Sequence, residues 1–154
     1  MMEPSGDNAG VPQTFLSSGR ACLVRWERVL ELADIHALLA SLGRARAEAG
    51  APLVAVWVVT RSAEVPSFRT RNALVGAQPA LLSHCEALIV ALECVQDHRP
   101  LLRALFFGPP AVTPPARLPE VFDDAEAAFA RARKFAAHDV IALQRLFLRH
   151  QEQR

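Results

Sequence analysis

The stretch LVAVWVVT, from Leu53 to Thr60, decides the fold of this chain. It is an unbroken run of aliphatic and β-branched residues with one tryptophan, and it follows the turn residues Gly50-Ala51-Pro52. Because the run shows no alternation of apolar and polar side chains, a strand built from it must be covered on both faces. Burial of a Val or Leu side chain contributes about 1.5–3 kcal/mol, so the whole stretch contributes on the order of 10 kcal/mol. We therefore predict that Leu53 to Thr60 is a central strand of a sheet.

Other strands are predicted on both sides of this stretch. Cys85 to Glu93 has an ALIVAL centre that also lacks alternation, so it is predicted to be an interior strand. A hairpin is predicted to open the domain, with Thr14 to Leu16 and Ala21 to Trp26 flanking the turn residues Ser17-Ser18-Gly19-Arg20. Because its second strand alternates, one face of that strand should be less buried, as at an edge or near-edge position. Leu118 to Phe122 is expected to add a short last strand.

Four helical segments are predicted between and after these strands. They are Glu31 to Ala49, about Ser67 to Ser83 with a break near Pro79, Val95 to Phe107, and a final helix from Asp123 toward Arg149. Asp34 is available as the N-cap of the first helix, and Asp123 as the N-cap of the last. Pro66 or Ser67 is suited to start the second helix. The first helix joins the hairpin to the central strand, so the two strands that it connects should run parallel.

Length and composition exclude several classes of protein. The 154 residues fit one compact domain, and residues 1–13 are too polar to form part of its core, so they are expected to be a flexible arm. The net charge of +1 creates no global field for nucleic acid, and no apolar run approaches the ~20 residues of a membrane span. Three cysteines make no disulfide framework, and no signal peptide is recognisable, so a reducing cytoplasm is expected.

The sequence contains no recognisable catalytic or metal-binding motif. It lacks a G-x-S-x-G elbow, a Gly-rich phosphate loop and an H-E-x-x-H pair, so no catalytic residue and no cofactor is predicted. A strand would separate Cys85 from Cys94 by roughly 30 Å, too far to share a metal ion. The acidic residues Asp123, Asp124 and Glu126 are interpreted as helix capping. An enzyme whose catalytic residues lie far apart in the sequence remains an alternative.

The order of the predicted elements points to a known fold. The segments VAVWVVT and PSFRTR, and the closing VFDDAEAAFARA, lie in an arrangement that resembles the STAS/SpoIIAA-like fold of anti-sigma-factor antagonists, over about Thr14 to Phe135. The resemblance implies an α/β domain with a central mixed, mostly parallel sheet of four to five strands flanked by helices. Residues 136–154 would then be a C-terminal helical extension.

The resemblance also implies a function. It implies a non-enzymatic regulatory module that binds a protein partner through the loop and helix after the central strand. In STAS antagonists a kinase phosphorylates the serine of an Asp-x-Ser segment at the start of that helix. The corresponding loop here reads TRSAEVPSFR, in which no Asp precedes the serines, and Ser62 and Ser67 occupy the place by position.

The same edge of the sheet is favoured on physical grounds. Ligands and partners gather at the carboxyl ends of parallel strands, where helix N-termini present unpaired N–H groups. Arginines close to such a helix start would welcome a phosphate group or an acidic partner surface. The alternative is that these arginines only face solvent and that Ser67 only caps the helix. The residues predicted to contact a partner are Arg61, Ser62, Val65, Ser67, Phe68, Arg69 and Arg71.

Two further alternatives concern apolar side chains. The final helix carries an apolar stripe that either contacts the core or mediates self-association, as in a homo-oligomer, and His138 and Asp139 are expected to mark a break in this helix. This stripe consists of Val140, Leu143, Leu146 and Phe147. The second alternative is a domain that binds a small apolar ligand such as a lipid. Trp57, Phe68, Phe106 and Phe107 would either line its pocket or fill the core.

Overall fold

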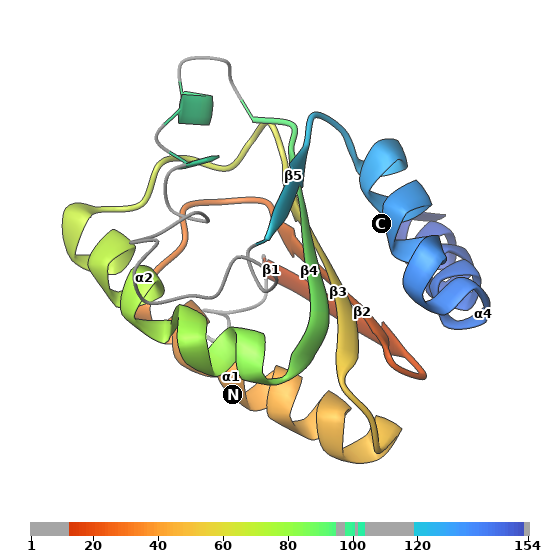
Figure 1. Cartoon of the computed structure of the whole chain (residues 1–154). Coiled ribbons are helices and arrows are strands. Elements are labelled where there is room, and N and C mark those ends of the chain that lie inside the picture. The colour runs from red at the N-terminus through yellow and green to blue at the C-terminus, as the bar shows by residue number, and fades with distance from the viewer. Residues whose placement is uncertain (1–12, 95–97, 101, 104–118, 153–154) are drawn as a thin grey trace, which may run out of the picture.

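The computed structural model of this chain describes residues 13–94, 98–100, 102–103 and 119–152. Within these residues, one sheet contains the strands β1 (Gln13–Ser18), β2 (Ala21–Trp26), β3 (Leu53–Val59), β4 (Cys85–Leu92) and β5 (Glu120–Phe122). The strands lie side by side in chain order, β1 antiparallel to β2 and every other neighbouring pair parallel (Figure 1). The predicted α/β fold with a mixed, mostly parallel sheet is confirmed.

Strand β3 lies at the centre of this sheet, as its sequence predicts. All seven of its residues are buried, and it pairs with β2 on one side and β4 on the other. Its side chains alternate between two apolar clusters: Trp57 packs among residues of the first, whereas Val56 and Val58 belong to the second. The continuous apolar run therefore reflects burial on both faces of the sheet.

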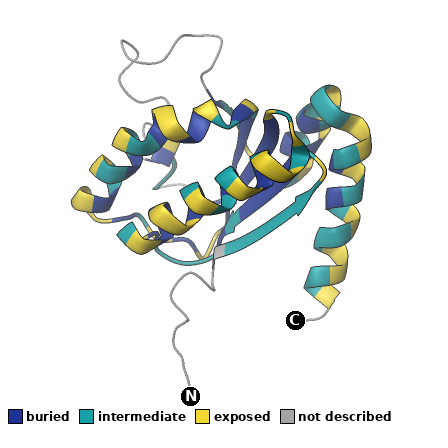
Figure 2. Ribbon diagram, turned by 90° about the horizontal axis from the view of Figure 1, so that it is seen from below, coloured by how far each residue is buried: buried dark blue, intermediate teal, exposed yellow. Residues whose placement is uncertain are grey.

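Helices α1 (Leu32–Ala49) and α2 (Phe68–Ser83) cover the first face, and the long helix α4 (Ala125–Glu152) covers the second (Figures 1 and 2). Under α1 and α2, the rings of Trp26 and Trp57 lie 5.7 Å apart between centroids at an angle of 44°. The exposed residues of both helices lie mainly on the side away from the sheet (Figure 2). No helix in the described ranges is long and apolar enough to cross a bilayer.

Helix α1 begins within one residue of its predicted start, but its N-cap differs from the prediction. Glu31, not Asp34, is the N-cap, and Asp34 is the third helical residue, whose carboxylate accepts a hydrogen bond of 2.8 Å from the Glu31 N–H. The two residues form a capping box, which satisfies two free donors at once. The Asp34 side chain is buried and forms a two-pronged ion pair with Arg28, with N–O distances of 3.0 and 3.1 Å.

Helix α2 confirms Ser67 as its N-cap but contradicts the predicted break. The Ser67 hydroxyl accepts a hydrogen bond of 3.2 Å from the N–H of Thr70. Pro79 lies inside the helix, which continues to Ser83. Pro79 and Ala80 are exposed, so the proline ring occupies the outer side of the helix, where solvent can reach the carbonyl group that it leaves unpaired.

Helix α4 begins at a different aspartate from the one predicted. The Asp124 carboxylate, not that of Asp123, accepts a hydrogen bond of 2.8 Å from the N–H of Ala127. The predicted break is real but lies at Ala136, whose backbone is extended (φ −154°, ψ 70°), and not at His138 or Asp139.

The second half of α4 changes direction at Ala136 and returns toward the first half. The Arg133 guanidinium donates a hydrogen bond of 2.9 Å to Oε1 of Gln144, although 11 residues of straight helix would separate them by about 16 Å along the axis. The helix therefore turns sharply between these two residues, and Figure 1 shows the second half as the darker blue coil behind the lighter one.

The apolar stripe of the second half packs on the sheet. Val140 and Leu143 are completely buried in the second apolar cluster, and Phe147 packs against that cluster. Leu146 is partly buried. The core interpretation of this stripe is thus correct for Val140 and Leu143, which leaves these two side chains no free surface for self-association. The exposed large apolar residues of this half are Ile141 and Leu148.

The predictions for the hairpin and for the last strand agree with the structure to different degrees. The hairpin strands reach Ser18, so the turn shortens to Gly19 and Arg20, with Gly19 at φ +56°. Strand β2 lies next to the edge strand, as predicted, but the less buried face predicted for it is limited to Arg25, since its other five residues are buried. Strand β5 falls within the predicted Leu118 to Phe122. The flexible arm before Gln13, the Pro-rich segment 108–118 and most of the predicted helix 95–107 lie outside the described residues.

Candidate functional site

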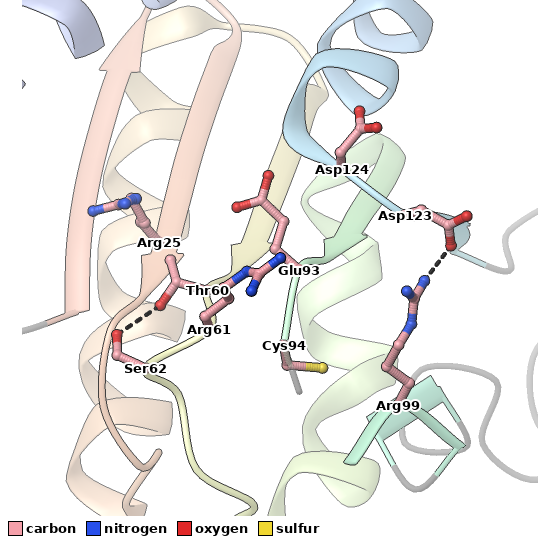
Figure 3. Close-up of a pocket in the computed structure, with 9 residues that line it drawn as sticks. All are labelled: Arg25, Thr60, Arg61, Ser62, Glu93, Cys94, Arg99, Asp123 and Asp124. Atoms are coloured by element: carbon pink, nitrogen blue, oxygen red, sulfur yellow. Dashed lines mark hydrogen bonds and ion pairs between the residues drawn. The ribbon is translucent and has the colours of Figure 1, made fainter. Parts of the chain in front are cut away.

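An open cleft of about 850 Å³ lies at the carboxyl ends of the parallel strands (Figure 3). Side chains from the ends of β2, β3 and β4 and from the turn between β5 and α4 meet there, because parallel strands deliver their last residues to one edge. The residues that line the cleft are Arg25, Thr60, Arg61, Ser62, Glu93, Cys94, Arg99, Asp123 and Asp124. The cleft is therefore polar, with both signs of charge.

The hydroxyl groups in the cleft bind the backbone of the loop after β2. Thr60 Oγ1 donates a hydrogen bond of 2.7 Å to the Trp26 carbonyl oxygen, and Ser62 Oγ donates one of 2.9 Å to the Glu27 carbonyl oxygen. The two hydroxyl oxygens are 3.0 Å apart. Each hydroxyl proton is thus occupied, and these groups hold the end of β3 against the end of β2.

The carboxylates in the cleft are also engaged. Glu93 Oε2 accepts a hydrogen bond of 2.9 Å from the N–H of Ala125, and Asp124 caps Ala127, so both satisfy the first turn of α4. Asp123 forms an ion pair with Arg99 (Figure 3). The capping interpretation of the acidic cluster therefore applies to Asp124, while Asp123 is engaged with an arginine.

Arg25 is held by two neighbours on the side of the sheet that α4 covers. Its guanidinium forms an ion pair of 2.9 Å with Glu27 and lies over the ring of Phe147, 5.6 Å from the ring centroid. The returning half of α4 thus touches a residue that lines the cleft. Phe147 belongs to the stripe for which core contact or self-association was predicted, and its ring contacts Arg25.

The thiol groups are not poised for nucleophilic chemistry. Burial raises the pKa of the Cys94 thiol in the cleft, and nearby Arg99 offsets only part of this effect. Burial likewise raises the pKa of Cys22, and it raises that of Cys85 to about 12. A thiol must lose its proton to attack a substrate, so none of the three is activated. Within the described residues, no three His, Cys, Asp or Glu side chains cluster as metal ligands.

The predicted partner-contact residues divide into two groups. Arg61 and Ser62 line the cleft, whereas the exposed Ser67, Phe68 and Arg69 and the partly buried Arg71 form a separate surface at the start of α2. We call this second group the α2 head. Val65, between the groups, is partly buried.

Within the α2 head, Ser67 and Arg71 are hydrogen-bonded to the start of the helix, and Phe68 lies beside Arg71. The Arg71 guanidinium donates a hydrogen bond of 3.2 Å to the Pro66 carbonyl oxygen and lies 5.8 Å from the Phe68 ring centroid. Phe68 is 68% exposed, the largest exposed fraction among the large apolar side chains of the described residues. No acidic side chain in the described part of the chain forms an ion pair with Arg61, Arg69 or Arg71.

Most of the residues that line the cleft were not predicted from the sequence. Arg25, Glu93, Cys94, Arg99, Asp123 and Asp124 were not predicted as site residues. A signal exists for two of them: Arg25 and Glu93 are charged residues at the ends of otherwise apolar strands, where a side chain reaches the edge of the sheet.

The proposed apolar pocket is not formed by the residues suggested for it. Trp57 is buried in the core against Trp26, whereas Phe68 is exposed on the α2 head, so they do not face a common cavity. Phe106 and Phe107 lie outside the described residues. The cleft itself is lined by charged and hydroxyl groups and does not favour an apolar ligand.

Comparison with known proteins identifies the fold. No protein-family model and no curated protein sequence matches the chain. Among solved structures, the anti-sigma factor antagonist SpoIIAA in its unphosphorylated form matches with a TM-score of 0.50 and 13% sequence identity. The match covers 78% of this chain and 98% of that one. The chain therefore has the STAS/SpoIIAA-like fold that the order of its elements predicted.

Proposed function

We propose that this protein is a non-enzymatic regulatory module that binds a protein partner through the α2 head and the loop that leads to it. The observation that carries the proposal is the exposure of Phe68 at 68%, beside arginines that have no acidic partner in the described residues. Aromatic and arginine side chains are the residue types most enriched in protein interfaces. The structural likeness to an anti-sigma factor antagonist supports a regulatory role of this kind.

The chemistry of the cleft supports a role without catalysis. The hydroxyl protons of Thr60 and Ser62 bind backbone oxygens, the carboxylates of Glu93 and Asp124 cap α4, and the Cys94 thiol keeps its proton. A catalytic site would present a general base or nucleophile with a pKa matched to its task. These groups instead fix the strand ends from which the partner-binding loop departs.

Phosphorylation of the loop is part of the proposal, and Ser67 suits it better than Ser62. Ser67 is exposed at the N-cap of α2, where a phosphate group would meet the positive end of the helix dipole and the arginines of the α2 head. The Ser67 hydroxyl donates a hydrogen bond of 3.1 Å to Thr70 Oγ1 in its own helix turn, whereas the Ser62 hydroxyl donates to the Glu27 carbonyl oxygen, so modification of Ser62 would break a bond between the ends of β3 and β2. Because all three cysteines are free thiols, we place the module in the cytoplasm.

The test compares two double variants with the unaltered protein. F68A/R69E changes the α2 head, and L148A/R149E makes the same kind of change on α4, where Leu148 is 62% exposed and Arg149 is also exposed. Each protein is immobilised, and the proteins that it retains from lysate of its native cells are quantified by mass spectrometry. We expect a specific set of proteins to be retained by the unaltered chain and by L148A/R149E, and lost from F68A/R69E. Equal retention by all three would exclude the α2 head as the partner surface.

A further inference from the structure

The outer side of α2 is unusual for an exposed helix because it carries no charge beyond its first turn. From Asn72 to Ser83 the sequence contains no acidic or basic residue. The exposed positions on this stretch are Asn72, Gly76, Pro79, Ala80 and Ser83, which are small or uncharged. A chain can approach such a helix closely, because no long side chain has to be moved aside and no charge has to lose its water.

The charged residues of α2 lie in its first turn, and their positive charge is unfavourable at the N-terminal end of a helix. Arg69 and Arg71 lie in the first turn and no acidic residue accompanies them there, although the helix dipole places positive potential at this end. Between residues 61 and 83 the acidic side chain is Glu64, against three arginines. The arrangement therefore does not stabilise the isolated helix, and it leaves a local excess of positive charge.

Phe68 supplies an apolar contact beside these cations. Its ring is exposed, and the Arg71 guanidinium lies 5.8 Å from its centroid, which orders the two side chains with respect to each other. An apolar side chain of a bound segment would cover the ring, while neighbouring carboxylates would meet Arg69 and Arg71 and the free N–H groups of the first turn.

We infer that the occupant of this surface is an acidic segment of the partner protein that carries one large apolar residue. The inference rests on the proposed function and specifies the chemistry of its partner. The acidic part of the segment binds the α2 head, the apolar residue covers Phe68, and the rest of the segment lies along the uncharged side of α2 as far as Ala80. Charge complementarity favours this direction, since the last turn of α2 has no basic residue of its own, and Arg46 of α1, which reaches that end, already donates a hydrogen bond of 3.0 Å to the Ser83 carbonyl oxygen.

The experiment selects peptides without assuming a partner. A random 12-residue peptide library displayed on phage is selected against the full chain, and the selected peptides are titrated into the ¹⁵N-labelled protein and followed by NMR. We expect the selected peptides to be rich in Asp and Glu around an apolar residue, and to shift the amide signals of residues 68–80. We expect R69E to weaken their binding about tenfold, R69K to leave it nearly unchanged, and R149E on α4 to have no effect.

The outcomes separate this inference from the proposed function. Peptides that shift the signals of residues 68–80 but have no acidic excess, or that bind R69E as well as the unaltered chain, would overturn the acidic chemistry and leave the α2 head as the partner surface. Peptides that bind elsewhere, or the absence of any selected peptide, would count against both. Binding that weakens with increasing salt and with F68A supports both.

Discussion

The backbone N–H of Arg20 donates a hydrogen bond of 3.0 Å to Oδ2 of Asp139, a residue 119 positions later in the chain. The bond ties the turn of the opening hairpin to the returning half of α4. The Arg20 guanidinium strengthens the same junction, since it donates to the Phe135 carbonyl oxygen at 2.6 Å and pairs with Glu86 on β4. The path of α4 across the sheet is thus fixed at the hairpin turn.

A substitution at Gly19 tests this junction. A Cβ atom at Gly19 would lie 2.5 Å from Cγ of Asp139, and Gly19 has a φ of +56°. We expect G19A to lower the free energy of unfolding by about 2–4 kcal/mol, from backbone strain and from overlap with the carboxylate. G50A is the control, because Gly50 has a φ of +67° and no atom within 4 Å, so it should lose only about 1–2 kcal/mol. Equal losses in urea denaturation would contradict the close contact with Asp139.

Substitutions in the second half of α4 test whether it is part of the core. Leu143 is fully buried, whereas Leu148 is 62% exposed on the same half. We expect L143A to lower the free energy of unfolding by about 2–4 kcal/mol, and L148A to change it by less than about 0.5 kcal/mol. Urea denaturation measures both. If both changes were small, residues 137–152 would be an appendage that contributes nothing to the stability of the domain.

The Arg28–Asp34 pair is predicted to be the most valuable of the ion pairs in the described residues. The Asp34 side chain is 2% exposed, and it accepts two hydrogen bonds from Arg28 and one from the Glu31 N–H. We expect D34A to lower the free energy of unfolding by about 2–4 kcal/mol, because it leaves the arginine without its buried carboxylate and removes a cap. The control is E120Q, which breaks the exposed Glu120–Arg131 pair and should change stability by under about 1 kcal/mol. Similar losses in both would refute the special role of burial.

The buried thiols predict a loss of stability at alkaline pH. Burial raises the pKa of Cys85 to about 12 and also raises that of Cys22, whereas the pKa of a thiol in the unfolded chain is about 8.5. Between these values the folded state retains protons that the unfolded state releases, so stability is complete below about pH 8.5 and falls as the pH rises toward 12. Each thiol contributes a slope of up to about 1.4 kcal/mol per pH unit.

Thermal unfolding between pH 8 and 11 measures this slope, and C85A should reduce it. The sequence has no tyrosine and a single lysine, Lys134, so few other groups titrate in the window. At pH 8, a thiol reagent should label Cys22 and Cys85 rapidly in denaturant and slowly in the folded protein. A slope that C85A leaves unchanged would contradict this prediction.

Local patterns predict the sheet well because burial acts on the same residues that the pattern describes. The continuous apolarity of Leu53 to Val59 and of the ALIVAL segment identifies interior strands without reference to their neighbours. The break of α4 has no such local signal, since Ala136 is a strong helix former. Arg20, which binds Phe135 and Asp139 on either side of Ala136, lies more than a hundred positions earlier, and a local pattern contains no information about it.

The edge of the sheet that holds the cleft was predictable from the sequence, but most of the residues that line the cleft were not. Parallel strands place their carboxyl ends together, so Thr60 to Arg71 could be assigned to one edge of the sheet. Which other side chains meet Arg61 and Ser62 depends on the register of β2 against β3 and β4, and on the entry of α4 beside Glu93. The separation of the cleft from the α2 head likewise depends on the length and path of a loop that makes few backbone hydrogen bonds.

Because the hydrogen bond between Arg20 and Asp139 joins an early residue to a late one, the domain can be completed only near the end of its synthesis. The ribosome releases both hairpin strands and the central strand well before residues 125–152 emerge. The apolar face of the sheet that α4 covers therefore stays exposed until α4 has been synthesised. We expect chaperones to protect the nascent chain during that interval. We also expect rapid degradation of products that stop before Asp139, because they lack the residue that binds the hairpin turn at Arg20.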